Sequence, residues 1–155
     1  YLLMKELKPG STQSENRKWY NEWVSKINGE VLDIGKSRFW DYSDTPYYYK
    51  SLDIDEKLCP DIVADICNNT VCQAVYDYVF CNGMYECVSD PQKMVDEVYR
   101  LLKPKGTAIF GFVGKDYKPY KKDWKFYDNN IDFKKFEILE KKDFDKNYHF
   151  IICRK

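Results

Sequence analysis

The feature that most constrains the fold is the alternation of strand-like apolar runs with helical segments. Strands are expected at residues 30–35, 47–53, 61–65, 76–81 and 107–113. This order predicts an α/β domain, in which helices connect and cover the strands of a parallel sheet. The run at 76–81 is apolar nearly throughout, which is typical of a central parallel strand with both faces buried.

Two segments are predicted to be helices. Residues 14–28 have apolar side chains at helical spacing and stop at Gly29. Residues 90–102 have the clearer pattern, because Asp90 can cap the first turn and Pro91 suits the first helical position. The apolar stripes comprise Trp19, Trp23, Val24 and Ile27 in the first segment, and Met94, Val95, Val98, Leu101 and Leu102 in the second.

The end of the chain departs from the alternation. Residues 136–140 and 149–153 are both strand-like, and a polar stretch at 141–147 separates them. A short reversal between neighbouring strands makes them antiparallel. The sequence therefore predicts a mostly parallel sheet that closes with one antiparallel hairpin.

Chain length and net charge limit the number of domains and the kinds of partner that we expect. A chain of 155 residues fits one domain. Its 25 basic and 25 acidic residues balance, so no global field draws it to nucleic acid or to an anionic membrane. No apolar run approaches the roughly 18 residues that span a bilayer, and the opening residues are too short for a signal peptide. We expect a cytoplasmic protein, with nucleic acid disfavoured as a partner and no membrane association.

Cysteine usage argues against metal and disulfide sites. The six cysteines form no C-x-x-C pair, and His149 is the one histidine. Zinc sites normally show tighter paired spacing. Several of the cysteines lie in strand-like apolar runs, where a thiol acts as a small hydrophobe. We therefore expect reduced thiols and no bound metal.

Acidic and glycine residues follow three of the predicted strands. In open α/β sheets, ligands bind beyond the carboxyl ends of the strands. Asp33 and Gly35 end the first strand, Asp53 ends the second, and Asp65 ends the third. A carboxylate there can accept bonds from ribose hydroxyls or from an amine, although each residue also suits an ordinary turn or helix cap. Taken in order, the set suits a ligand shaped like adenosine with a charged tail.

These segments resemble the motifs of class I S-adenosylmethionine-dependent methyltransferases, and the chain is similar to the small, type 11-like members. The matching strings are Val31-Leu32-Asp33-Ile34-Gly35, Ser51-Leu52-Asp53-Ile54-Asp55, residues 60–66, residues 76–86 and residues 98–106. The last string, which ends in Lys103-Pro104-Lys105-Gly106, is the most specific. The resemblance implies a Rossmann-like three-layer sandwich with a mostly parallel seven-stranded sheet and an antiparallel last strand.

The resemblance also implies S-adenosylmethionine as cofactor and S-adenosylhomocysteine as product. Asp33 and Gly35 would hold the methionine end, Asp53 the ribose hydroxyls, and Asp65 with Ile66 the adenine. The full implied set is Asp33, Gly35, Lys36, Ser37, Asp53, Ile54, Asp65, Ile66, Cys81 and Asn82.

Methyl transfer is an in-line displacement that depends chiefly on alignment in a water-poor cleft. It needs a general base only when the acceptor stays protonated until late. Glu86 is the candidate base and His149 a weaker one. The ordinary interpretation makes Glu86 a solvated loop carboxylate and His149 a structural residue.

Lysine alternates with aromatic residues across 115–127, directly after the last parallel strand. Such a segment suits an anionic small-molecule, sugar or nucleotide-like acceptor, or else a solvated surface loop. Predicted acceptor contacts are Trp40, Tyr85, Tyr117 and Trp124. The expected division is an N-terminal helical cap at 1–28, a cofactor core at 29–113, a substrate-facing loop at 114–135 and a strand pair at 136–155. No sequence feature specifies an oligomeric state.

Three alternatives stay open. The later glycines of the first loop are absent and Cys87 stands where the family has histidine, which favours a catalytically weak or inactive cofactor-binding or partner-binding domain. A nicotinamide-dependent oxidoreductase is disfavoured, because no G-x-G-x-x-G follows the first strand. A nucleic-acid methyltransferase is disfavoured by the neutral net charge.

Overall fold

The computed structural model describes residues 15–35, 48–114, 125–127, 130–144 and 148–155. The elements are α1 Glu15–Val24, β1 Glu30–Ile34, β2 Tyr48–Asp53, a 3-10 helix η1 Glu56–Leu58, β3 Ile62–Val63, β4 Tyr76–Asn82, α2 Pro91–Leu101, β5 Leu102–Val113, β6 Glu137–Phe144 and β7 Tyr148–Arg154.

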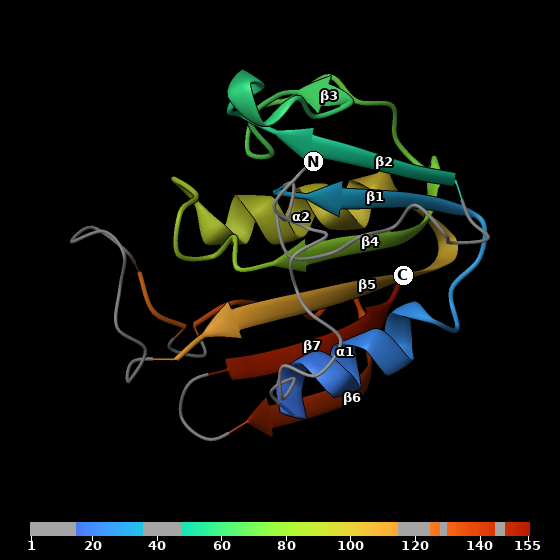
Figure 1. Cartoon of the computed structure of the whole chain (residues 1–155), viewed down its shortest axis with the longest axis vertical. Coiled ribbons are helices and arrows are strands. Elements are labelled where there is room, and N and C mark those ends of the chain that lie inside the picture. Colours follow the sequence, from blue (N-terminus) through green and yellow to red (C-terminus); the bar gives the residue numbers. More distant parts are fainter. Residues whose placement is uncertain (1–14, 36–47, 115–124, 128–129, 145–147) are drawn as a thin grey trace, which may run out of the picture.

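The strands form one seven-stranded sheet in the order β3-β2-β1-β4-β5-β7-β6. Neighbours from β3 to β5 pair in parallel, and β7 runs antiparallel to both β5 and β6. The arrowheads of β1, β2, β4 and β5 accordingly point to the same side in Figure 1. The predicted mostly parallel sheet with an antiparallel last strand is confirmed.

The two helices lie on opposite faces of this sheet, with α2 behind it and α1 in front of β6 and β7 (Figure 1). Alternate strand residues explain how both faces become apolar. On β1, Leu32 and Ile34 belong to the cluster that includes α2, whereas Val31 belongs to the cluster that α1 packs against. The result is the helix–sheet–helix sandwich expected from the sequence.

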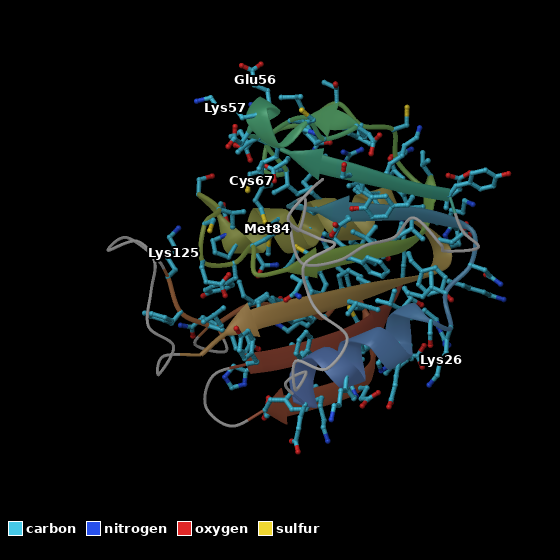
Figure 2. The ribbon with its side chains drawn as sticks, viewed as in Figure 1. Lys26, Glu56, Lys57, Cys67, Met84 and Lys125 are labelled. Carbon is cyan, nitrogen blue, oxygen red and sulfur yellow. The ribbon has the colours of Figure 1, made fainter. Side chains whose placement is uncertain are left out.

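At the outer side of β2, side-chain bonds to the backbone fix the short strand β3. The Asp61 carboxylate accepts from the backbone N–H of Ser51 at 2.8 Å and from its hydroxyl at 3.0 Å. Between these strands, Asp55 caps η1 by accepting from the N–H of Lys57 at 3.0 Å. Glu56 and Lys57 project outward from this turn (Figure 2).

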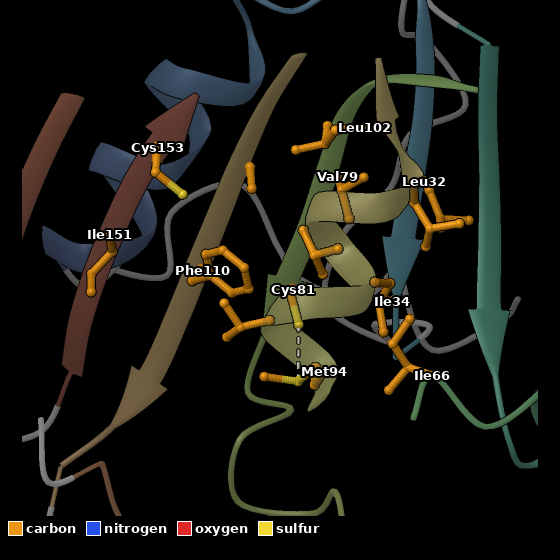
Figure 3. Packing of buried hydrophobic residues seen from close by; sticks show 14 of the residues in the cluster. Leu32, Ile34, Ile66, Val79, Cys81, Met94, Leu102, Phe110, Ile151 and Cys153 are labelled. Carbon is orange, nitrogen blue, oxygen red and sulfur yellow. Dashed lines mark hydrogen bonds between the residues drawn. The ribbon is translucent and has the colours of Figure 1, made fainter. Parts of the chain in front are cut away.

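The core beneath α2 is packed by fully buried side chains from the helix and the sheet. Met94 lies against Cys81 of β4, with 3.4 Å between the two sulfur atoms (Figure 3). Val98 and Leu101 continue the same stripe and are 0% exposed. Complete burial of such a side chain stabilises the fold by about 1.5–3 kcal/mol, so the predicted apolar stripe of this helix anchors the sheet.

The structure moves several predicted boundaries. Helix α1 ends at Val24, and the chain closes with tighter turns in which Lys26 and Ile27 donate to Trp23 and Val24. Strand β5 begins at Leu102, directly after α2, so residues 103–106, which precede the strand predicted at 107–113, also lie within the strand, and its pairing with β4 is irregular there. Strand β6 extends to Phe144, because residues 141–144 pair with β7 although their polarity suggested a loop.

Arg100 ties α2 to the segment that leads from β3 to β4. Its guanidinium donates to the carbonyl of Val71 at 2.7 Å and to the side-chain oxygen of Asn69 at 3.0 Å. It also forms an ion pair with Glu97 at 2.8 Å. Asn69 in turn donates to the carbonyl of Ile66 at 2.8 Å, so the network holds the chain that follows Asp65.

We expect Arg100→Ala to lower the free energy of unfolding by about 2 kcal/mol, because the partly buried Glu97 carboxylate and two polar atoms lose their charged donor. Urea denaturation followed by tryptophan fluorescence measures the change. Lys134→Ala is the control, since Lys134 is exposed and pairs with Asp132 at 3.6 Å; its effect should stay within about 0.5 kcal/mol. Equal effects of the two variants would contradict the role assigned to Arg100.

Candidate functional site

The strand order reverses between β1 and β4, which creates the switch point of the sheet. The chain first adds β2 and β3 on one side of β1, and then crosses to add β4 and β5 on the other. The chain therefore leaves β1 and β4 towards opposite sides, and open α/β sheets bind ligands in the crevice expected beyond the carboxyl ends of strands at such a point.

A glycine in a left-handed conformation follows each of the two strands at this point. Gly35 has φ +76° after β1, and Gly83 has φ +69° after β4. Both are anchored, since Gly35 donates to the carbonyl of Leu52 at 2.8 Å and Gly83 to that of Gly111 at 2.9 Å. Side chains are disfavoured at such φ values, which is why glycine suits both positions.

The surroundings of these two glycines differ. Among the described residues, no heavy atom lies within 4 Å of a Cβ atom built on Gly83, whereas a Cβ atom on Gly35 would overlap the thioether of Met84. Figure 2 shows Met84 and Lys125 on the side to which the parallel strands point, and Lys26 on the opposite side. The crevice thus has one open glycine face and one that Met84 covers.

Asp33 lies in β1, two residues before Gly35, and is 2% exposed. Its carboxylate accepts a hydrogen bond of 2.7 Å from the hydroxyl of Tyr49 on β2. Tyr49 therefore holds the charge of Asp33 beside the first loop. The predicted pairing of Asp33 with a ligand amine would place that amine near Gly35, which is two residues further along the chain.

The predicted ribose and adenine residues lie at the ends of β2 and β3. One carboxylate oxygen of Asp53 accepts from the backbone N–H of Asp55 at 2.9 Å, which fixes the side chain at the strand end. The next residue, Ile54, is 69% exposed. Asp65 similarly accepts from the N–H of Cys67 at 2.9 Å. An anchored carboxylate beside an uncovered apolar side chain offers contacts suited to a sugar and a base.

Other predicted site residues have side chains buried in the protein. Ile66 is 2% exposed and lies in the core, and the thiol of Cys81 points to Met94. Tyr85 is 6% exposed and packs edge-on against Phe112. For these three, only backbone atoms or the ring edge of Tyr85 could face a ligand.

Asn82 is half-buried at the end of β4. Its side-chain oxygen lies so close to Gly111 of β5 that a Cβ atom there would overlap it. The amide of Asn82 therefore lies against β5, the neighbour of β4 on the side away from β1.

Glu86 is buried, contrary to the expected solvated carboxylate. It is 2% exposed, and its Oε1 accepts from the N–H of Val113 at 2.5 Å. Its Oε2 is buried and has no hydrogen-bond partner among the described residues. Burial raises the pKa of the Glu86 carboxyl, and backbone N–H groups of Glu86 and Val113 offset part of that rise. This side chain joins the loop after β4 to the end of β5.

Part of the lysine-rich segment is also engaged in the fold. The ammonium of Lys125 donates to the carbonyls of Val88 at 3.1 Å and Ser89 at 2.8 Å. Tyr127 stacks on Phe112 with ring centroids 4.5 Å apart. His149, the weaker base candidate, bonds Asp143 at 2.8 Å. The predicted residues Lys36, Ser37, Trp40, Tyr117 and Trp124 lie outside the described residues.

Gly83 follows the strand predicted at 76–81 as Gly35 follows the one at 30–35, although only Gly35 belongs to the predicted cofactor set. The approach of Met84 to Gly35 could not be predicted, because it joins loops that follow two different strands, β4 and β1.

The described residues also bear on metal, disulfide and membrane features. Within the described ranges, no group of three histidine, cysteine or acidic residues could hold a metal ion. All six cysteines lie in those ranges, and no disulfide joins them. No described helix is long and apolar enough to cross a membrane.

Comparison with protein families gives a match to the methyltransferase domain over residues 38–110. A curated relative from Plasmodium falciparum (isolate 3D7), named "Putative histone-lysine N-methyltransferase 1", is 28% identical over 107 residues. The match covers 61% of this chain but only 2% of the length of that protein. It therefore relates this chain to one small segment of a much larger protein.

Solved structures share the fold at low sequence identity. An S-adenosylmethionine-dependent methyltransferase from Mesorhizobium loti superposes with a TM-score of 0.69 at 12% identity, covering 92% of this chain and 98% of its own. The cyclase SpnF superposes with a TM-score of 0.65 at 12% identity, covering 97% and 84%.

The family match lies over the segments whose motifs suggested the resemblance, and the fold extends the likeness to the whole sheet. Gly35, Gly83 and Asp53 lie at or just after the carboxyl ends of β1, β4 and β2, where open α/β sheets bind ligands. The chain therefore contains a segment similar to methyltransferase domains, and its fold is that of S-adenosylmethionine-dependent methyltransferases.

Proposed function

We propose that this domain transfers a methyl group from S-adenosylmethionine to a small-molecule, sugar or nucleotide-like acceptor. The observation that carries the proposal is the pair of left-handed glycines, Gly35 and Gly83, on the two sides of the switch point. Neither residue has a side chain over its backbone, so an elongated ligand could approach the backbone here from both halves of the sheet once Met84 leaves Gly35.

The residues after β2 supply the adenosine end of the proposed site. Asp53 is already fixed by Asp55, so it can accept from ribose hydroxyls without first losing side-chain freedom. Ile54 offers an exposed apolar surface for the base. Asp65 can accept from an exocyclic amine, and the Arg100 network holds the chain that follows it.

The residues after β1 and β4 supply the methionine end. The buried Asp33 carboxylate favours a positive charge near Gly35, which suits the amino group of the cofactor. The open face of Gly83 lets a ligand approach the backbone closely. When bound, the cofactor supplies the electrophilic methyl group, and the protein aligns it with the acceptor and excludes water.

The acceptor is proposed to be a small molecule that carries negative charge. The proposal rests on the lysines of residues 115–127, apart from Lys125, whose ammonium is occupied by loop carbonyls. The predicted contacts Trp40, Tyr117 and Trp124 remain part of this proposal, together with the edge of Tyr85.

A second candidate function is cofactor or partner binding with little or no methyl transfer. Two observations favour it. The cyclase SpnF shares this fold, so the fold alone does not specify methyl transfer. The candidate base Glu86 is buried and bonded to Val113, which leaves it poorly exposed to an acceptor. Turnover by the purified chain with an added acceptor would exclude this function.

We expect isothermal titration to give micromolar binding of S-adenosylmethionine and S-adenosylhomocysteine, and Asp53→Ala to weaken both at least about tenfold. A charge-assisted hydrogen bond contributes roughly 1.5–3 kcal/mol, which corresponds to that loss. Asp53→Asn keeps an acceptor for the N–H of Asp55 and should lose less affinity.

Glu56→Ala is the matched control for this titration, because Glu56 is an exposed acidic residue three positions further along the same loop. Its affinity should equal that of the unmodified chain. Absence of binding to the unmodified chain would overturn the proposed cofactor site, and equal losses in both variants would show that Asp53 has no specific role.

We expect Glu86→Gln to become more stable relative to the unmodified chain as the pH rises. When folding raises the pKa of a carboxyl, the group contributes its full stabilisation at pH values below its pKa in the unfolded state. That stabilisation is lost as the pH rises through its pKa in the folded state. The pH range in which the two proteins diverge in stability therefore begins near 4.5, the ordinary pKa of a glutamate carboxyl, and extends upward. Urea denaturation at several pH values measures the difference, with the exposed Glu137→Gln as control. A difference independent of pH would contradict the buried titration.

A further inference from the structure

The backbone of Met84 is held by hydrogen bonds on both sides of its side chain. It begins a tight turn in which its carbonyl accepts from the N–H groups of Cys87 at 3.0 Å and Val88 at 3.1 Å. The preceding Gly83 is held by β5 through Gly111. These bonds to the turn and to β5 therefore fix the position of the Met84 Cα atom, from which the side chain extends.

The side chain itself crosses from the end of β4 to the end of β1. Its Sδ occupies the space where a Cβ atom of residue 35 would lie, and its Cγ and Cε are 3.0 and 3.3 Å from that position. The residue is half-buried and packs against the margin of the core. Because glycine has no side chain, a neighbour can lie where the Cβ atom of another residue would be. At Gly35 that neighbour is Met84.

We propose that Met84 is a gate that sets cofactor affinity: its thioether fills the contact on Gly35 and must swing aside before the methionine end of the cofactor can bind there. This inference rests on the proposed function. It explains why two equivalent glycines differ, since Gly83 has an open face and Gly35 does not.

Methionine suits this role chemically. Its unbranched side chain has three rotatable bonds and changes rotamer at low cost, so it can leave Gly35 without any movement of the turn. When only a fraction of molecules has the binding-competent rotamer, the apparent dissociation constant rises by the reciprocal of that fraction. The side chain at position 84 should therefore change affinity without contributing any polar contact to the ligand.

The test compares two substitutions with opposite expected effects on S-adenosylhomocysteine binding, measured by isothermal titration. Met84→Ala removes the obstacle and should tighten binding about three- to tenfold, as expected if the competent rotamer is a minor population. Met84→Ile introduces a β-branched side chain that is stiff at χ1 and should weaken binding.

Met94→Leu is the control, because Met94 is fully buried beneath α2 and the exchange conserves volume. Its affinity should stay unchanged. Urea denaturation of each variant separates an affinity change from a loss of folded protein.

A second readout follows the side chain directly. The sequence has three methionines, so methyl-labelled methionine gives few NMR signals, and the Met84 signal is assigned by its loss in Met84→Ala. Addition of S-adenosylhomocysteine should shift this signal strongly and leave the Met94 signal nearly unchanged. An unshifted Met84 signal at saturating ligand would overturn the gate.

The outcomes separate the gate from the cofactor site. Weaker binding by Met84→Ala would make Met84 a ligand contact and overturn the gate, while the proposed function would stand. Binding by Met84→Ala that is lost on adding Asp53→Ala would support both. No binding by the unmodified chain or by either variant would overturn the proposed function and the gate together.

Discussion

The parallel pairing of β1 with both β2 and β4 is the constraint on which the rest of the structure depends. Strand β1 is held on each side, with Ile34 opposite Leu52 on β2 and Cys81 on β4. Because β1 lies between β2 and β4, the chain leaves β1 towards one side of the sheet and leaves β4 towards the other. Both turns lie at the carboxyl ends of these strands. The crevice is thus a consequence of strand order, before any side chain defines its chemistry.

The loop after β4 converts this crevice into a shaped site. Glu86 joins it to the end of β5, and Lys125 bonds its carbonyls at Val88 and Ser89. Among the described residues one oxygen of the buried Glu86 carboxyl has no hydrogen-bond partner, which costs stability. The same loop carries Met84 over Gly35, which links the order of this loop to access at the first strand.

The sequence was sufficient to predict the fold because its signals are local. Apolar runs, Asp90 with Pro91, and the reversal near the chain end each depend on neighbouring residues, and the sheet follows from them. The burial of Glu86 could not be predicted, since it arises from contact with Val113, far along the chain. Lys125 similarly looks like a free surface charge in sequence and finds its carbonyl partners only after folding.

The distinction between fold and chemistry decides how the site should be understood. A methyltransferase and a cyclase both share this architecture with the chain, so the reaction cannot be encoded in the strand order. The strand order places the carboxyl ends of β1, β2 and β4 where open α/β sheets bind ligands. In the proposed function, Asp53 and Ile54 would bind one end of the ligand and the backbone at Gly35 the other. In the proposed gate, the side chain between that ligand and the backbone is Met84, and its rotamer rather than any charge would determine when the site can be filled.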